Sequence, residues 1–184
     1  MVSGFVTAHE TLESPIAPPV TALVRLLDEL RTTIERMSDD RYVEIPVTRR
    51  SGSVGAHVRH SLDHVAAFLD GANAGVLSYD RRMRGTLVEV SRNAAVDRIV
   101  SLTSALLDLD PLSLQRPLRL DVQLDAAGVS CSVTSTAGRE LAYVISHTIH
   151  HNATMGVLLT ETGASLPERF GVAASTPTAV ACAQ

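Results

Sequence analysis

Six of the seven histidines in this 184-residue chain fall in two short segments, 57–64 and 147–151. The members are His57, His60 and His64 in the first segment and His147, His150 and His151 in the second. On a helix of about 3.6 residues per turn, the spacing within each segment places its histidines on one stripe. If the two stripes form one site, the two helices that carry them must be neighbours in the fold.

Imidazole nitrogen is the commonest protein ligand for transition metals and binds them while neutral near pH 7. The His147/His151 pair lies in a strongly apolar segment, 141–159. Burying several imidazoles without partners costs about a few kcal/mol each, and a metal ion would satisfy them. The alternative is that these histidines are ordinary core or surface residues. We favour a metal site with open coordination positions, as catalytic sites have.

Hydrophobic residues recur at helical spacing in four segments, expected as helices over 19–38, 53–70, 91–109 and 138–162. Ser53 is a candidate N-cap for the second helix, and Gly71 is its expected stop signal. Residues 71–90 then form a long linker. The hydrophobic residues of the first helix share one face, and they are Val20, Leu23, Val24, Leu27, Leu30 and Ile34.

Between the third and fourth helices the hydrophobic period changes from 3.6 to two, on either side of a turn at 125–128 that contains glycine. The alternating residues are Leu118, Leu120, Val122, Leu124, Val129, Cys131 and Val133. We therefore expect an all-α, antiparallel four-helix bundle with a β-hairpin inserted between helices three and four. The bundle domain spans 19–172, with an N-terminal arm at 1–18 and a C-terminal tail at 173–184.

Composition excludes several classes of function. The net charge of −4 and a pI near 5.9 argue against a nucleic-acid partner, and no stretch reaches the roughly 18 apolar residues of a membrane span. All sixteen basic residues are arginine, so a Schiff-base lysine is excluded. Cys131 and Cys182 follow no metal or redox spacing. With no signal-peptide pattern at the N-terminus, we expect a cytoplasmic protein.

The two histidine motifs together resemble the DinB/YfiT-like superfamily over roughly residues 19–172. The motifs are Ser53-Val54-Gly55-Ala56-His57-Val58-Arg59-His60 and His147-Thr148-Ile149-His150-His151. The resemblance implies a four-helix bundle with one metal-binding histidine on the second helix and a His-x-x-x-His pair on the last. Carried onto this chain, the implied ligands are His60, His147 and His151, which would hold a divalent ion such as zinc, nickel or iron.

The resemblance leaves His57, His64 and His150 as extra histidines that would line the open face of the metal. We expect His64 or His150 to serve as a catalytic general base. The family often has Arg-Gly-Gln after the last ligand, whereas this chain has Asn152-Ala153-Thr154. That departure concerns the substrate pocket rather than the metal site.

Family members with assigned roles include transferases and isomerases that use small thiols. The resemblance therefore implies a metal-dependent enzyme that acts on a low-molecular-weight thiol or its conjugate, similar to a thiol S-transferase. One alternative is a hydrolase in which the metal activates water, with Asp63 as the nearest candidate base. Another is a non-enzymatic, metal-binding module that forms homodimers.

Overall fold

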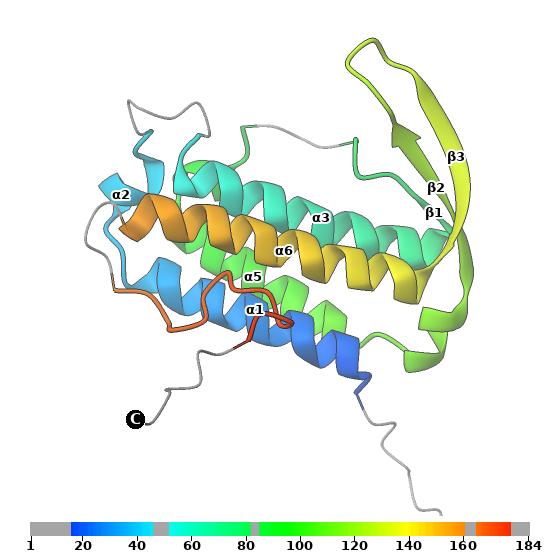
Figure 1. The fold of residues 1–184 in the computed structure, drawn as a ribbon, viewed down its shortest axis with the longest axis horizontal. Coiled ribbons are helices and arrows are strands. Elements are labelled where there is room, and N and C mark those ends of the chain that lie inside the picture. Colours follow the sequence, from blue (N-terminus) through cyan, green and yellow to red (C-terminus); the bar gives the residue numbers. More distant parts are fainter. Residues whose placement is uncertain (1–15, 46–51, 82–84, 161–164, 178–184) are drawn as a thin grey trace, which may run out of the picture.

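The computed structural model describes residues 16–45, 52–81, 85–160 and 165–177. Over these ranges the chain is mostly helical with a small three-stranded sheet. Four long helices correspond to the predicted ones: α1 (Pro18–Glu35), α3 (Val54–Ala74), α5 (Arg92–Leu107) and α6 (Ala137–Thr160) (Figure 1). None of the described helices is both long and apolar enough to cross a membrane.

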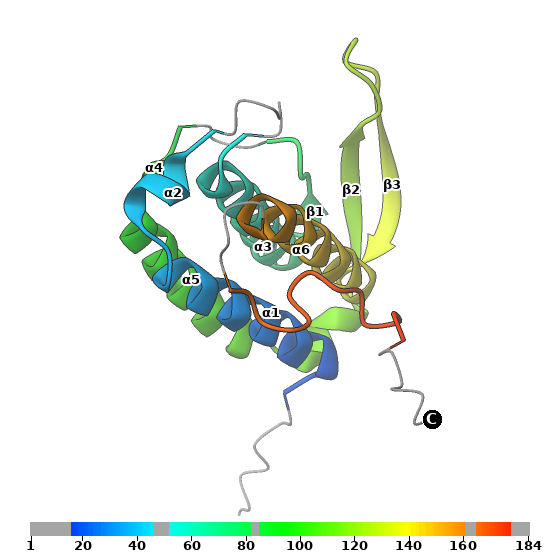
Figure 2. The same ribbon diagram turned by 60° about the vertical axis from the view of Figure 1, so that its left-hand side comes forward.

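The shorter elements connect and cover these helices. They are the helices α2 (Asp39–Val43) and α4 (Leu87–Val90), the 3-10 helix η1 (Pro111–Gln115), and the strands β1 (Val76–Leu77), β2 (Pro117–Gln123) and β3 (Ser130–Thr136). The predicted hairpin is confirmed, because β2 and β3 pair antiparallel with Leu120 opposite Val133. Figure 2 shows this hairpin projecting well beyond the helices.

The predicted start of α3 is confirmed, but its predicted end is wrong. The Ser53 side chain accepts a hydrogen bond from the backbone N–H of Ala56 at 3.1 Å, which confirms the predicted N-cap. The helix continues past Gly71 and ends at Gly75, whose φ of 73° lies in the left-handed region. Gly71 has another role: a Cβ there would lie 2.8 Å from the Leu77 side chain, so its absence lets β1 pack back against α3.

The segment expected to be a linker, 71–90, therefore contains structure. Its first residues complete α3, β1 pairs parallel with β2, and α4 precedes α5. Val76 lies opposite Arg119 and Leu77 opposite Leu120. The sequence did not indicate β1 and α4, because each is very short and depends on partners distant in the chain.

Contacts at the start of α5 show how the long helices run relative to one another. The carbonyl oxygen of Glu89, just before α5, lies against Gly55 at the start of α3, and Arg92 bonds the carbonyl oxygen of Ile34 at the end of α1. Helices α3 and α5 therefore begin at the same end of the molecule and run in the same direction, as Figure 1 shows. The expected antiparallel arrangement holds for α1 with α5 and for α3 with α6, but not for α3 with α5.

The core is mostly aliphatic, with the buried rings of Tyr42, Phe68 and Phe170, and it is continuous through all four long helices. Of the six residues expected to face inward from α1, five are buried, and Val24 packs against the core as a partly buried residue. Leu23, Leu27 and Ile34 are fully buried. Two of the described histidines, His64 and His151, are buried as well, so the histidine stripes are partly enclosed by the fold.

Gly55 supplies a test of this packing. A Cβ at this position would overlap the carbonyl oxygen of Glu89 and the ring of Tyr42. We expect Gly55→Ala to lower the free energy of unfolding by about 1–3 kcal/mol, because the backbone of α4 must move to make room.

Gly156→Ala is the matched control in a helix interior, because its new Cβ would lie 3.6 Å from the nearest atom, in the Phe170 ring. That variant should be neutral or more stable by about 0.5–1 kcal/mol. Urea denaturation measures both variants. Equal midpoints would show that α3 and α4 are not packed as closely as described.

Candidate metal centre

The two histidine stripes meet along the antiparallel pair of α3 and α6. The ring centroid of His60 lies 5.0 Å from that of His147 and 4.6 Å from that of His151. His64 stacks on His147 with centroids 3.8 Å apart and an interplanar angle of 19°. The two helices that carry the stripes are therefore neighbours, as a shared site requires.

Three of these rings form a group that could hold a metal ion. One nitrogen from each of His60, His64 and His147 lies within 4.8 Å of the other two. His64 is buried, and the other two rings are half-buried. The group contains neither carboxylate nor cysteine, so it offers three neutral imidazoles, a donor set that suits zinc, nickel or iron.

The orientation of His64 is defined by a hydrogen bond to the backbone. Its Nδ1 lies 3.0 Å from the carbonyl oxygen of His60. A carbonyl oxygen only accepts, so Nδ1 carries the hydrogen and the lone pair of this ring lies on Nε2. Histidines that bind metals commonly donate their other ring N–H to a backbone carbonyl in this way.

His151 lies at the other side of the cluster, against His57. Their Nδ1 atoms are 3.2 Å apart and their ring centroids 5.4 Å apart, so one Nδ1 donates to the other. Of the three predicted ligands, the structure places His60 and His147 in the ligand group, with His151 in ring contact with both. The assignment of His151 as a ligand stays a prediction.

The two histidines predicted as general bases occupy different environments. His64 lies inside the ligand group. His150 is exposed, and its ring contacts that of His151 at a centroid distance of 5.3 Å. Asp63, the carboxylate suggested for a hydrolase, forms an ion pair with Arg59 at 2.8 Å.

Sequence reasoning missed a buried carboxylate next to the cluster. Glu140 is fully buried and accepts hydrogen bonds from Ser135 Oγ at 2.6 Å, Arg139 Nη1 at 3.0 Å and the Tyr79 hydroxyl at 3.1 Å. Burial and the neighbouring Glu140 charge raise the pKa of Tyr79, so its hydroxyl stays protonated and donates. The Tyr79 ring in turn stacks on His64, with centroids 5.0 Å apart and planes 9° apart.

The sequence contained a signal for part of this network. Glu140, Tyr143, His147 and His151 follow one another at spacings of three, four and four, so they share one stripe of α6. A charged residue on the apolar side of a helix indicates a buried polar site. The partners Tyr79 and Ser135 lie in other elements, and no local pattern joins them to this stripe.

A cavity of about 380 Å³ adjoins the histidine cluster. His64, Tyr79, Tyr143 and Arg139 line it on one side, and β2 contributes Leu120 through Gln123 on the other. Its volume falls in the range of small-molecule sites. A ligand in this cavity would contact His64 directly.

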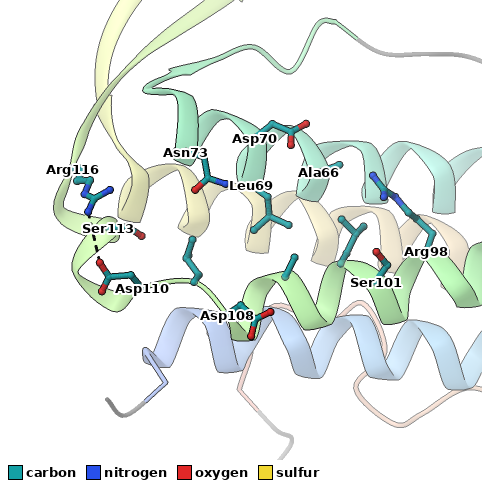
Figure 3. Close-up of a pocket in the computed structure, with 13 residues that line it drawn as sticks. Ala66, Leu69, Asp70, Asn73, Arg98, Ser101, Asp108, Asp110, Ser113 and Arg116 are labelled. Atoms are coloured by element: carbon teal, nitrogen blue, oxygen red, sulfur yellow. Dashed lines mark ion pairs between the residues drawn. The ribbon is translucent and has the colours of Figure 1, made fainter. Parts of the chain in front are cut away.

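A larger cavity of about 560 Å³ lies between α3, α5 and η1 (Figure 3). Carboxylates of Asp70, Asp108 and Asp110 line it with Arg98 and Arg116, and Arg116 pairs with Asp110 at 3.8 Å. Its residues from α3 lie on the helix face opposite the histidines, given about 100° of rotation per residue. It therefore does not belong to the candidate metal centre.

Comparison with known proteins agrees with this arrangement. The sequence profile described as "DinB family" matches residues 24–173, which is most of the chain. The chain belongs to the DinB family. The resemblance noted from the histidine motifs is thereby confirmed.

A solved structure and a curated relative give further likenesses. The crystal structure of a DinB-like protein, YjoA, from Bacillus subtilis matches this DinB protein with a TM-score of 0.58 and 20% identity, over 84% of this chain and 99% of the other. That likeness shows the fold alone. FK506-binding protein 5 from Rhizopus delemar is 38% identical over 102 residues, which is 55% of this chain and 26% of that protein. The matched region therefore spans about a quarter of the relative.

Because the hydrophobic core runs through all four long helices and is built from side chains that bind no metal, we expect the fold to survive metal removal. Chelator treatment should lower the melting temperature and leave the helical far-UV circular dichroism spectrum in place. An ion that binds only the native state adds about 4 kcal/mol at a thousandfold excess over its Kd. A random-coil spectrum after chelation would contradict this expectation.

Proposed function

We propose that this DinB-family chain is a metal-dependent enzyme that acts on a low-molecular-weight thiol or its conjugate. The observation that carries the proposal is the histidine group, with ligand atoms within 4.8 Å, beside a cavity of small-molecule size that its member His64 lines. Family membership and the all-imidazole donor set support it.

The family resemblance and the geometry both point to His60 and His147 as ligands of the proposed site. The third is His151 by resemblance or His64 by position. A divalent ion held by neutral imidazoles keeps its full charge and would stabilise a thiolate, lowering the pKa of a bound thiol. Whichever of His64 and His151 is not a ligand remains beside the site as a proton acceptor.

The chain's own residues would bind and orient the substrate in the cavity beside His64. The rings of Tyr79 and Tyr143 lie 5.1 Å apart and present apolar surface. The Arg139 guanidinium lies over the Tyr143 ring at 5.7 Å, on the solvent side of Glu140. These groups would cover the body of a small substrate and reduce the access of water.

The carboxylates nearby favour thiol chemistry over hydrolysis. Asp63 is held by Arg59, and Glu140 already accepts hydrogen bonds from three side chains. Neither carboxylate is therefore available in this arrangement as a base that activates water. The hydrolase becomes the better explanation only if thiols fail to bind.

Metal binding tests the shared ligands. We expect His60→Ala and His147→Ala each to abolish stoichiometric binding of zinc or cobalt, because each removes one of three imidazoles. His150→Ala is the matched control, since that histidine is exposed and outside the ligand group. Elemental analysis and calorimetry give the stoichiometry. A His60→Ala protein that keeps a full equivalent of metal would exclude this centre.

Thiol binding tests the chemistry. The absorption bands of a cobalt-substituted protein should shift when 2-mercaptoethanol is added and stay unchanged with ethylene glycol, which is its matched alcohol. The reason is that a thiolate entering the coordination sphere changes the ligand field, whereas a neutral alcohol binds weakly. If no small thiol alters the cobalt bands, the hydrolase or binding-module alternative would replace this proposal.

A further inference from the structure

We propose that two copies of this chain associate through β3, with the free edges of the two strands paired antiparallel about a twofold axis at Val133. The inference goes beyond the proposed function and does not depend on a metal ion. Three features of the hairpin carry it, namely the free edge of β3, the composition of that strand, and the apolar face that β2 and β3 share.

The strand β3 lies at the edge of the three-stranded sheet. Within the described part of the chain it pairs with β2 alone, and Figure 2 shows the hairpin projecting beyond the helices. Every residue from Ser130 to Thr134 is exposed. An edge strand of this kind presents a row of backbone N–H and C=O groups to any strand that can approach it.

The hydrogen bonds of the hairpin show which backbone groups of β3 face outward. The N–H of Leu124 donates to the carbonyl oxygen of Val129, which lies opposite it. Bonded pairs alternate along an antiparallel ladder, so the odd-numbered residues of β3 direct their backbone groups toward β2. The even-numbered residues direct theirs to the free edge, and they are Ser130, Ser132 and Thr134.

The composition of β3 lacks the features that usually keep an edge strand from pairing. Its seven residues include no charged side chain and no proline. Natural edge strands commonly carry lysine or proline, or are covered by another element. The charged residues of the hairpin strands, Arg119 and Asp121, instead belong to β2, which has a neighbour on each side. One β3 can therefore approach another without repulsion between like charges.

A twofold axis at Val133 places similar residues opposite each other. Val133 faces Val133 of the second copy, and Ser132 faces Thr134 of the second copy. The latter two exchange backbone hydrogen bonds across the axis, because both direct their backbone groups outward. Cross-strand pairs of serine and threonine are favourable. Because the same surface is used on both copies, the contact closes on itself and gives a dimer rather than a fibre.

The apolar face of the hairpin is the third feature. Leu118 and Leu120 at its base are buried, whereas Leu124 and Val129 on the same face at its tip are 60% and 54% exposed. Antiparallel pairing places the tip of each hairpin beside the base of the other. The apolar face of the tip is then directed to the side on which the other copy's helices lie. Exposed apolar surface of this kind commonly marks an interaction site.

A cysteine at the axis tests the register. Val133→Cys, made together with Cys131→Ser and Cys182→Ser, places two thiols opposite each other at a non-hydrogen-bonded pair, where Cα atoms lie about 4.5 Å apart. A disulfide can bridge that separation. Oxidised glutathione should therefore give a crosslinked dimer on a gel run without reductant.

The matched control for the crosslink carries Cys182→Ser alone. Its remaining thiol, on Cys131, lies opposite Ser135 of the second copy in this register and should give no crosslinked dimer. Absence of the crosslink in the Val133→Cys protein, or an equal yield in the control, would overturn the register.

Charges at the edge test whether the two strands pair. Ser132→Lys with Thr134→Lys places like charges opposite each other across the axis. Ser132→Lys with Thr134→Glu differs at one position and places opposite charges there. The new side chains of this second variant also face opposite charges in their own hairpin, on Asp121 and Arg119. We expect the double-lysine dimer to dissociate at least about tenfold more readily than the Lys/Glu dimer.

Light scattering coupled to size-exclusion chromatography, over a range of protein concentrations, measures the mass of both variants and of the wild type. Far-UV circular dichroism checks that each remains folded. A wild-type chain that is monomeric throughout would overturn the proposal. A double-lysine variant that stays as dimeric as the Lys/Glu variant would also overturn it, because the copies would then associate through another surface. Metal and thiol binding by the same samples tests the proposed function separately.

Discussion

The close packing of α3 against α6 determines where the histidines of the cluster lie. At its centre Ser61 and Thr148 are both fully buried, and their hydroxyl oxygens are 3.5 Å apart. Small side chains at this crossing let the two helix backbones approach each other. The rings of His60 and His147, next to these two residues in the sequence, then lie 5.0 Å apart between the helices, and His64 and His151 follow about one turn further along. Larger residues at this crossing would separate the two stripes and leave no common ligand point.

The sequence predicted what depends on local periodicity. The four long helices, the Ser53 cap and the hairpin all follow from spacing and turn chemistry. The contact between the two histidine stripes was only a condition for a shared site, because it joins helices distant in the sequence. The sequence did not predict α4, β1 or the parallel course of α3 and α5. Those features depend on long-range contacts such as Arg92 with the end of α1. Likewise, the motif identified six histidines but not the pairing of His57 with His151.

The buried carboxylate of Glu140 connects the hairpin to the candidate metal centre. Ser135, near the end of β3, and Tyr79, after β1, both donate to Glu140 on α6. Strands and helix therefore meet at a carboxylate that must keep all of its partners to remain buried. Displacement of the hairpin would remove the Ser135 bond from the carboxylate that also accepts from Tyr79, whose ring stacks on His64. The cavity beside His64 is lined by these same elements, so its shape depends on the same contacts.

The surplus of histidines distinguishes the candidate metal centre from a site that holds ligands alone. Five rings, those of His57, His60, His64, His147 and His151, form a chain of ring contacts between α3 and α6. A centre built from imidazoles needs only three of them for one ion, so two rings lie beside the ligands whichever three bind it. Each imidazole has two ring nitrogens, so the rings beside the ligands offer further hydrogen-bond donors and acceptors at the candidate centre.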